Sequence, residues 1–454
     1  MISDRTLRRI LPSNMTVRAV GPLVRLAVGA AVVILVAMWL FYYAALAQVM
    51  VGELHMNDFG KFYYSAQYYL EGRDIYGGSP ATLIPVDTSE SRHFWNLNPP
   101  HFHLLILPFA VLTPGIAIMA WSIVNLLALA LAAALIVKEL QIRISGAGLS
   151  WATALIVISS PMDTIIATGQ FTFLLMVPVT LAWTAARRGQ WERAAVILGL
   201  LASIKPFFGI FWVYFLLRRQ VRAAVAMAAV CAACFLVGLM AFGWQAHVQW
   251  LNALAAVEWA WAPMNGSIAG IVARMFADSP LFDPIVSAPA LVRPITALGN
   301  LAIFVASAVL LRHQQAAGSA DIVFTVLLLV AQLVSPLGWI YYLPLVAGPL
   351  VGWWRGSKML VPAARWLLWL SLPGLILPHV FTAVWRHDPW AGPTIGSIYF
   401  WSTLFMWAAV FVQEWVQRSV PAVSFPRRRR AASCRDQHAR SGPGKRLHIH
   451  FRAA

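Results

Sequence analysis

The chain has 454 residues, of which 60% are hydrophobic and only 11% are charged. This composition excludes an ordinary soluble domain and predicts a polytopic membrane protein. Much of the formal net charge of +17 lies in residues 427–454, where nine Lys and Arg stand against one Asp without a fold-forming apolar pattern. We therefore expect no nucleic-acid partner, and we interpret residues 417–454 as a disordered basic cytosolic tail held near anionic membrane lipids.

The apolar residues come in blocks of about 15 to 25, and a helix needs roughly 20 such residues to cross the hydrocarbon. The blocks show no alternating polar face, as a β-barrel would require, so an all-α fold is predicted. Residues 1–25 are basic and are expected to be cytosolic. The sequence "AALAQ" at 44–48 resembles a signal-peptide cleavage box, but the apolar block before it is long, which favours an uncleaved anchor.

About twelve membrane segments are predicted within a transmembrane domain covering residues 26–416. They lie near residues 26–48, 116–137, 148–165, 170–186, 191–204, 205–217, 221–242, 293–312, 321–336, 338–354, 360–379 and 394–416. The excess of Lys and Arg in cytosolic loops places both termini inside and two large loops, 49–115 and 243–292, outside. A third outer loop, near 380–393, is shorter. Chemistry or recognition is therefore expected on the outer face of a bacterial cell membrane.

The first outer loop contains the polar and aromatic stretch "LHMNDFGKFYYSAQYYLEGRDIYG" at 54–77. Asn57 or Asp58 can cap a helix that runs to about Leu70 and is closed by Gly72. Six residues form one apolar face of this helix, and three other side chains point elsewhere. We interpret the segment as a helix lying in the membrane interface. The apolar residues are Phe59, Phe62, Tyr63, Ala66, Tyr69 and Leu70, and the others are Lys61, Ser65 and Glu71. Asp58 is then either a helix cap or a carboxylate suited to general-base work.

Two further stretches interrupt the apolar pattern. "NPPHFHLLILPFAVLTPG" at 98–115 is short and broken by proline, so it predicts an interfacial or re-entrant helix, with a spanning helix as the alternative. Its two histidines, His101 and His103, favour structural roles over metal binding. In "SIKP", Pro206 is expected to break the helix and turn the chain back. Lys205 there is costly in an apolar segment and is a candidate functional residue, with a snorkelling or ion-paired lysine as the alternative.

A succession of motifs resembles glycosyltransferase family 87, the polyprenyl-phosphomannose-dependent mannosyltransferases of the GT-C type. The motifs run in order from about residue 50 to residue 350. They are "DFGKFYYSAQYYLEGRDIY", "NPPHFHLLILPFAVL", "ATGQFTFLLMVPVTLAW", "RAAVILGLLASIKPFFGIFWVYFLLRRQVRAA", "NGSIAGIVAR" and "SPLGWIYYLPL". The resemblance implies transfer of a hexose, mannose by family, from a polyprenyl-phosphate-linked donor to a lipid or glycan acceptor hydroxyl on the outer face. It further implies inversion of configuration and no nucleotide-sugar.

The resemblance also implies roles for individual residues. Asp58 stands where the family has an acidic residue taken to act as the base. Lys205, Arg274 and Lys61 are candidates for binding the donor phosphate, because their positive charge would stabilise the departing group. Other polar and aromatic residues are candidates for substrate binding, with packing or capping as the alternative for Gln170, Asn265 and Ser267. The substrate-binding candidates are Asn57, Gln170, Asn265, Ser267, Trp339, Tyr341 and Tyr342.

One motif departs from the family pattern. Where many members have a histidine after the tryptophan, "SPLGWIYY" places Tyr341. A tyrosine can hydrogen-bond a phosphate or a sugar hydroxyl, but it does not titrate near neutral pH.

No metal or other cofactor is predicted, because the outer carboxylates are scattered rather than paired. A leaving lipid phosphate needs only positive side chains. A polytopic transporter and a non-catalytic partner in envelope assembly remain the alternative functions.

Overall fold

The computed structural model describes residues 29–30, 33–45, 47–48, 57–76, 96–257, 259–312, 319–357, 359–379, 382 and 388–419. The predicted cytosolic N-terminus and all but the first residues of the basic tail lie outside this set. In the part of the chain that the structure describes, every regular element is a helix, and β-pairing is limited to an isolated bridge between Asn265 and Trp339. The predicted all-α fold is confirmed.

The helices up to residue 217 occupy the first predicted outer loop and, from α5 onward, the predicted apolar blocks. They are α3 Asn57–Leu70, η1 Pro100–Leu105, α4 Leu107–Ala110, α5 Pro114–Glu139, α6 Gly146–Val157, α7 Ser160–Thr168, α8 Thr172–Arg187, α9 Trp191–Ile204, η2 Pro206–Gly209 and α10 Ile210–Leu217. A shorter apolar helix, Val33–Ala45, precedes them.

The helices after residue 220 complete the bundle. They are α11 Val221–Ala255, η3 Trp259–Trp261, α12 Ile268–Phe276, η4 Pro289–Leu291, α13 Val292–Leu311, α14 Ala320–Val334, η6 Ile340–Val346, α15 Ala347–Gly356, α16 Pro362–Ile376, η8 Ile395–Ser397 and α17 Ile398–Ser419.

Only some of these helices are long enough to cross a membrane. By length and composition, four of the described helices qualify, or five if the bent pair α6–α7, which turns by 56°, counts as one span. The predicted count of about twelve is not confirmed. Several apolar blocks form shorter helices because local breaks end them. One such break separates α9 from η2, where Lys205 has extended backbone angles before Pro206.

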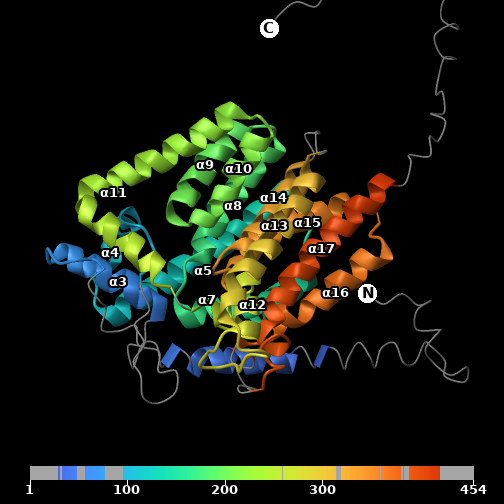
Figure 1. Cartoon of the computed structure of the whole chain (residues 1–454), viewed down its shortest axis with the longest axis horizontal. Helices are drawn as coiled ribbons and strands as arrows, with labels where there is room; N and C mark the ends of the chain where they lie inside the picture. Colours follow the sequence, from blue (N-terminus) through green and yellow to red (C-terminus); the bar gives the residue numbers. More distant parts are fainter. Residues whose placement is uncertain are drawn as a thin grey trace, which may run out of the picture.

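Several short or broken elements of the bundle gather at one end. In Figure 1, α3, α7, α12 and the helix Val33–Ala45 lie toward the lower side, and the lower half of the long helix α11 descends toward them. Gly243 interrupts α11 with φ 76° and ψ 176°. This break coincides with the predicted start of the second outer loop at residue 243, so the chain after Gly243 belongs to the same end of the molecule as α3.

Helix α3 is enclosed by protein on almost every side. Phe59 stacks on Trp121 with ring centroids 5.3 Å apart, and Phe62 meets Phe102 edge to face at 5.2 Å. The predicted helix and most of its apolar face are confirmed, although Leu70 at its end is exposed.

Two of the three side chains that were predicted to point away from the apolar face of α3 are covered by other segments. Lys61 and Ser65 are buried. Asn96 covers Ser65 by donating to its Oγ at 2.8 Å, and the Trp259 ring lies 5.5 Å from Lys61 Nζ. Both covering residues come from segments that the helical period of α3 cannot reveal. The helix is therefore a packed wall of the molecule rather than an amphipathic helix resting on a surface.

Candidate active site

A cavity of about 790 Å³ lies at the end of the bundle where α3 packs. Its wall is formed by α3, by the ends of α7, α9, α11 and α14, and by the segments that lead into η3 and η6. Most lining residues are apolar, such as Phe207, Leu254 and Met264. The polar and charged lining residues are Asp58, Lys61, Asn98, Thr168, Gln170, Lys205, Ser335, Tyr341, Tyr342 and His379. A few polar groups in an apolar pocket are typical of a small-molecule or lipid site.

Asp58 lies in the first turn of α3 and faces the cavity. Its Oδ1 is 2.5 Å from Lys61 Nζ, and its Oδ2 accepts a hydrogen bond of 2.5 Å from Gln170 Nε2. Both carboxylate oxygens are thus held by side chains. Asp58 also stays partly accessible, with 22% of its side chain exposed. This arrangement fixes the direction of the carboxylate and leaves it open to a ligand in the cavity, as a general base requires.

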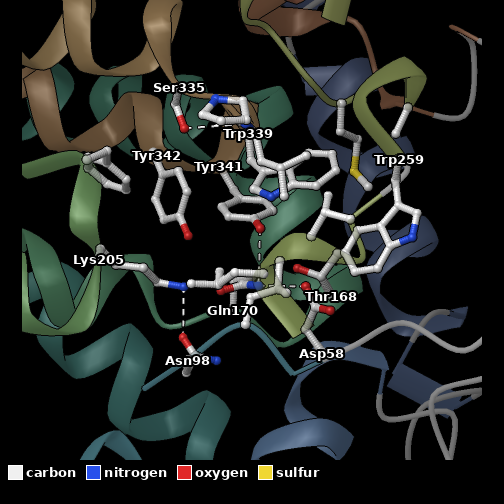
Figure 2. Close-up of a pocket in the computed structure, with 18 of the residues that line it drawn as sticks. Asp58, Asn98, Thr168, Gln170, Lys205, Trp259, Ser335, Trp339, Tyr341 and Tyr342 are labelled. Atoms are coloured by element: carbon white, nitrogen blue, oxygen red, sulfur yellow. Dashed lines mark hydrogen bonds between the residues drawn. The ribbon is translucent and has the colours of Figure 1, made fainter. Parts of the chain in front are cut away.

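Gln170 follows Gly169, which has left-handed backbone angles and ends α7. The side chain of Gln170 connects Asp58 to the opposite wall of the cavity. Its Nε2 also donates to Tyr341 Oη at 3.2 Å (Figure 2). Its Oε1 is buried and has no hydrogen-bond partner among the described residues. A buried amide oxygen without a partner costs free energy, and a substrate hydroxyl in the cavity would supply the missing donor.

Lys205 reaches the cavity from the break between α9 and η2. Its Nζ donates to Asn98 Oδ1 at 2.9 Å and lies 4.8 Å from the centre of the Phe171 ring and 5.6 Å from that of Tyr342. In Figure 2, Lys205 and Asn98 lie on one side of Gln170, and Asp58 and Thr168 lie on the other. The predicted helix break at "SIKP" therefore delivers an ammonium group to the wall of the cavity.

A buried network behind Lys61 and Lys205 holds the polar side of the cavity. Asn96 Nδ2 donates to His103 Nε2 at 2.6 Å, and Asn96 Oδ1 accepts from Asn98 Nδ2 at 3.2 Å. His103 Nδ1 lies 3.1 Å from Pro100 O and acts as the donor, because Nε2 is the acceptor for Asn96. Burial lowers the pKa of His103 to about 4. The expected structural role of this histidine agrees with its complete burial.

Three predicted site residues lie outside the cavity lining. Asn265 Nδ2 donates to Ala260 O at 2.8 Å and Pro336 O at 2.9 Å, while its Oδ1 accepts from the backbone of Ser267 and Gly338. Ser267 caps α12 by accepting from Gly270 N at 3.1 Å. These contacts correspond to the packing and capping alternative.

Arg274 is the third of these residues. It is fully buried, and its guanidinium donates to Ser397 Oγ and to the carbonyl oxygens of Trp261, Ala262 and Asn265 at 2.9 to 3.2 Å. The protein itself thus occupies much of the donor capacity that would grip a phosphate. In the described structure, Arg274 ties α12 to the loop before it and to η8, which precedes α17.

The aromatic candidates follow one another at the start of η6. Trp339 and Tyr341 stack with ring centroids 6.0 Å apart, and Tyr342 lies 4.7 Å from Tyr341 (Figure 2). All three line the cavity. The aromatic faces of these three residues suit contact with a sugar ring or a lipid chain. The side chain of Asn57, another candidate, lies outside the described part of the structure.

Other lining residues have no counterpart in the sequence prediction. Asn98 and Thr168 stand within or beside the quoted motifs, where a polar residue close to a predicted helix end was the available signal. His379 comes from the segment after α16, far from every motif, and no signal in the sequence points to it. No group of three or more His, Cys, Asp or Glu side chains that could hold a metal ion occurs among the described residues. The prediction of a metal-independent reaction stays a prediction.

The geometry can support a displacement reaction. A carboxylate on one side of the cavity can take a proton, and an ammonium on the other can stabilise a departing anion.

Comparisons with known proteins agree with this chemistry. The sequence model of glycosyltransferase family 87 matches residues 96–336. The chain is also 27% identical over 343 residues to the polyprenol-phosphate-mannose-dependent alpha-(1-2)-phosphatidylinositol mannoside mannosyltransferase of Mycobacterium tuberculosis. That alignment covers 70% of this chain and 74% of the mycobacterial protein. No solved structure matches the chain significantly.

Proposed function

Since the chain belongs to glycosyltransferase family 87 and is a mannosyltransferase-like membrane enzyme, we propose that it transfers mannose from a polyprenyl-phosphate-linked donor to a hydroxyl group of a lipid or glycan acceptor. The reaction proceeds with inversion at the sugar carbon and on the outer face of the membrane, with both termini in the cytosol. Family membership favours this enzyme over the transporter and the non-catalytic partner.

The observation that carries the proposal is the pairing of Asp58 and Lys205 across one cavity. Asp58 and its partner Gln170 form one part of the wall, and Lys205 with Asn98 forms another (Figure 2). A single displacement needs a base on the side from which the acceptor attacks and a positive group on the side from which the phosphate departs. We propose that Asp58 takes the first of these positions and Lys205 the second.

The proposed step accounts for each bond. The acceptor oxygen forms a bond to the anomeric carbon, and the bond from that carbon to the phosphate oxygen breaks. The acceptor proton passes to the Asp58 carboxylate, and the electron pair of the broken bond leaves with the polyprenyl phosphate. Lys205 stabilises the phosphate, and Lys61, which holds Asp58 Oδ1, orients the base.

The name of the relative and the apolar cavity wall both support a proposal for the acceptor class. The mycobacterial relative is named for a phosphatidylinositol mannoside acceptor, and we propose a mannosylated lipid of this kind for the present chain. The apolar lining residues support lipid substrates, because acyl or prenyl chains can leave the bilayer only into apolar surroundings.

Asp58→Asn provides the direct test. Purified protein in liposomes receives radiolabelled polyprenyl-phosphomannose together with phosphatidylinositol mannosides, and transfer to the acceptor is measured. Removing the base is expected to lower kcat by about 10² to 10⁴. Glu71→Gln is the matched control, because Glu71 lies just after the same helix but is 54% exposed and pairs with Arg73. The control should transfer mannose at the wild-type rate.

Two outcomes would contradict the proposal. Full activity of Asp58→Asn would remove Asp58 from the role of base. If the wild-type protein transfers no sugar from the polyprenyl-phosphate donor to any acceptor, the proposed reaction itself is refuted. The anomeric configuration of the product, measured by NMR, tests inversion separately.

A further inference from the structure

An Asp–His pair with a buried aspartate reaches the cavity from a segment that the proposed mechanism does not use. His379 lines the cavity. Its ring Nδ1 lies 2.6 Å from Asp163 Oδ2, and its backbone N–H donates to the same oxygen at 3.1 Å. One carboxylate oxygen thus holds both the backbone and the ring of His379, which fixes the orientation of the imidazole.

The burial of Asp163 shows how strongly this pair is built into the fold. Asp163 is fully buried, and the Tyr42 hydroxyl approaches its carboxylate as well. An aspartate in apolar surroundings is costly unless it is paired, so its position near a cavity calls for a reason beyond packing. Orienting a ligand-binding imidazole is such a reason, since carboxylates commonly fix the tautomer and direction of a functional histidine.

Helix α7 connects the pair to the proposed base. Ser160 and Asp163 at the start of α7 both hold the segment of His379, because Ser160 Oγ donates to Leu377 O at 2.5 Å. At the other end of α7, Thr168 lines the cavity and Gln170 binds Asp58. A helix of nine residues therefore sets the positions of His379 and Asp58 together.

The tautomer of His379 follows from its partner. An ionised carboxylate can only accept hydrogen bonds, so Nδ1 carries the proton that points to Asp163. In the neutral ring the lone pair then lies on Nε2, on the opposite side of the imidazole from Asp163. Such a nitrogen accepts a hydrogen bond from a hydroxyl group.

We propose that His379 is a substrate-binding residue of the transferase cavity, that its Nε2 accepts a hydrogen bond from a sugar hydroxyl of the donor, and that Asp163 is its positioning residue. The inference rests on the proposed function. We assign a sugar hydroxyl rather than the phosphate to His379, because Lys205 supplies the cation for the phosphate. Lys205 lies across Gln170 from Thr168, the last residue of α7 (Figure 2).

Two substitutions separate substrate binding from support of the fold. Asparagine at this position keeps a donor near the place of Nδ1, so His379→Asn retains the contact to Asp163 but has nothing at the place of Nε2. Glutamine extends to the place of Nε2, so His379→Gln retains an acceptor for the substrate. We expect His379→Gln to keep most of the wild-type kcat/KM and His379→Asn to lose about tenfold, the worth of one hydrogen bond. A purely structural role predicts the reverse order.

Donor analogues identify the hydroxyl. Polyprenyl-phosphomannose analogues that each lack one hydroxyl are compared in the wild type and in His379→Asn. In the wild type, the analogue without the contacted hydroxyl should lose about tenfold in kcat/KM, and in His379→Asn this loss should disappear because its partner is absent. Thermal unfolding in detergent shows whether both variants are folded.

Each remaining outcome is decisive. If His379→Asn matches the wild type while His379→Gln loses activity, or if every analogue shows the same loss in both proteins, the proposed contact is refuted. A wild-type protein that transfers no sugar refutes the proposed function and this inference with it. That result differs from one in which the wild type is active and only the His379 contact fails.

Discussion

Replacing Gly169 by alanine is expected to damage the site without touching a substrate. Gly169 has φ 67°, and a Cβ built on it would lie 2.7 Å from Phe59 Cβ. A left-handed alanine costs about 1 to 2 kcal/mol. Carbon atoms normally stay about 3.5 Å or more apart, so α3 must also retreat by about 1 Å, which costs about 1 to 3 kcal/mol more. Gly169→Ala should therefore lower the free energy of unfolding by about 2 to 5 kcal/mol.

The same displacement should affect catalysis. Asp58 precedes Phe59 in the chain, and Gln170 follows Gly169, so the retreat of α3 lengthens the contact between Asp58 and Gln170. A misplacement of about 1 Å can lower a rate by about 10². We expect kcat to fall by about this factor, measured with the mannose-transfer assay in liposomes at a temperature where the variant is still folded.

Gly189→Ala is the matched control. Gly189 has φ 74° but nothing within 4 Å of an added Cβ, and it lies in the turn between α8 and α9. It should lose only the backbone contribution of about 1 to 2 kcal/mol and keep the wild-type kcat. Equal loss of stability and equal activity in the two variants would refute the steric argument.

Three further predictions concern charge, packing and pH. Lys205→Met should raise the donor KM at least tenfold, because a hydrogen bond to a charged group is worth about 1.5 to 3 kcal/mol. Lys205→Arg should recover part of the lost donor affinity, and an unchanged KM in Lys205→Met would exclude the phosphate contact. Asn265→Ala removes four hydrogen bonds and should lower the unfolding free energy by about 3 kcal/mol, whereas Asn300→Ala, which removes one bond of 3.4 Å, should lower it by less. Equal losses would contradict the bracing role of Asn265. His103 has a pKa of about 4 in the folded protein and about 6.5 when unfolded, so the unfolded chain binds more protons between these values. The neutral His103 contributes up to about 3 kcal/mol to the free energy of unfolding, and this contribution is complete above pH 6.5 and is lost as the pH falls toward 4. Thermal unfolding measured against pH should show this loss of stability in the wild type and a smaller loss in His103→Asn.

The sequence predicts the elements of the site better than their surroundings. The helix that carries Asp58 and the break that exposes Lys205 both follow from local chemistry, a polar helix start in one case and a proline in the other. Their meeting with Gln170 and Tyr341 in one cavity is consistent with the motifs that resemble the family.

The remaining features depend on contacts between distant segments. The sequence of α3 does not show that Lys61 and Ser65 are buried, because Asn96 and Trp259 cover them from other loops. The motif of Arg274 suggests a phosphate ligand, yet the backbone carbonyls that receive its hydrogen bonds leave no trace in side-chain identity. His379 meets Asp163 across 216 residues, a pairing that no local pattern encodes.

The apolar wall of the cavity has a consequence for how the rate must be described. If donor and acceptor both enter from the bilayer, the enzyme responds to their number per unit of membrane area rather than to their amount per volume of solution. Adding inert phospholipid at constant total substrate should then slow the reaction, because it thins the substrates out within the membrane plane. Activity in a cell would follow the lipid composition around the protein as closely as the supply of donor.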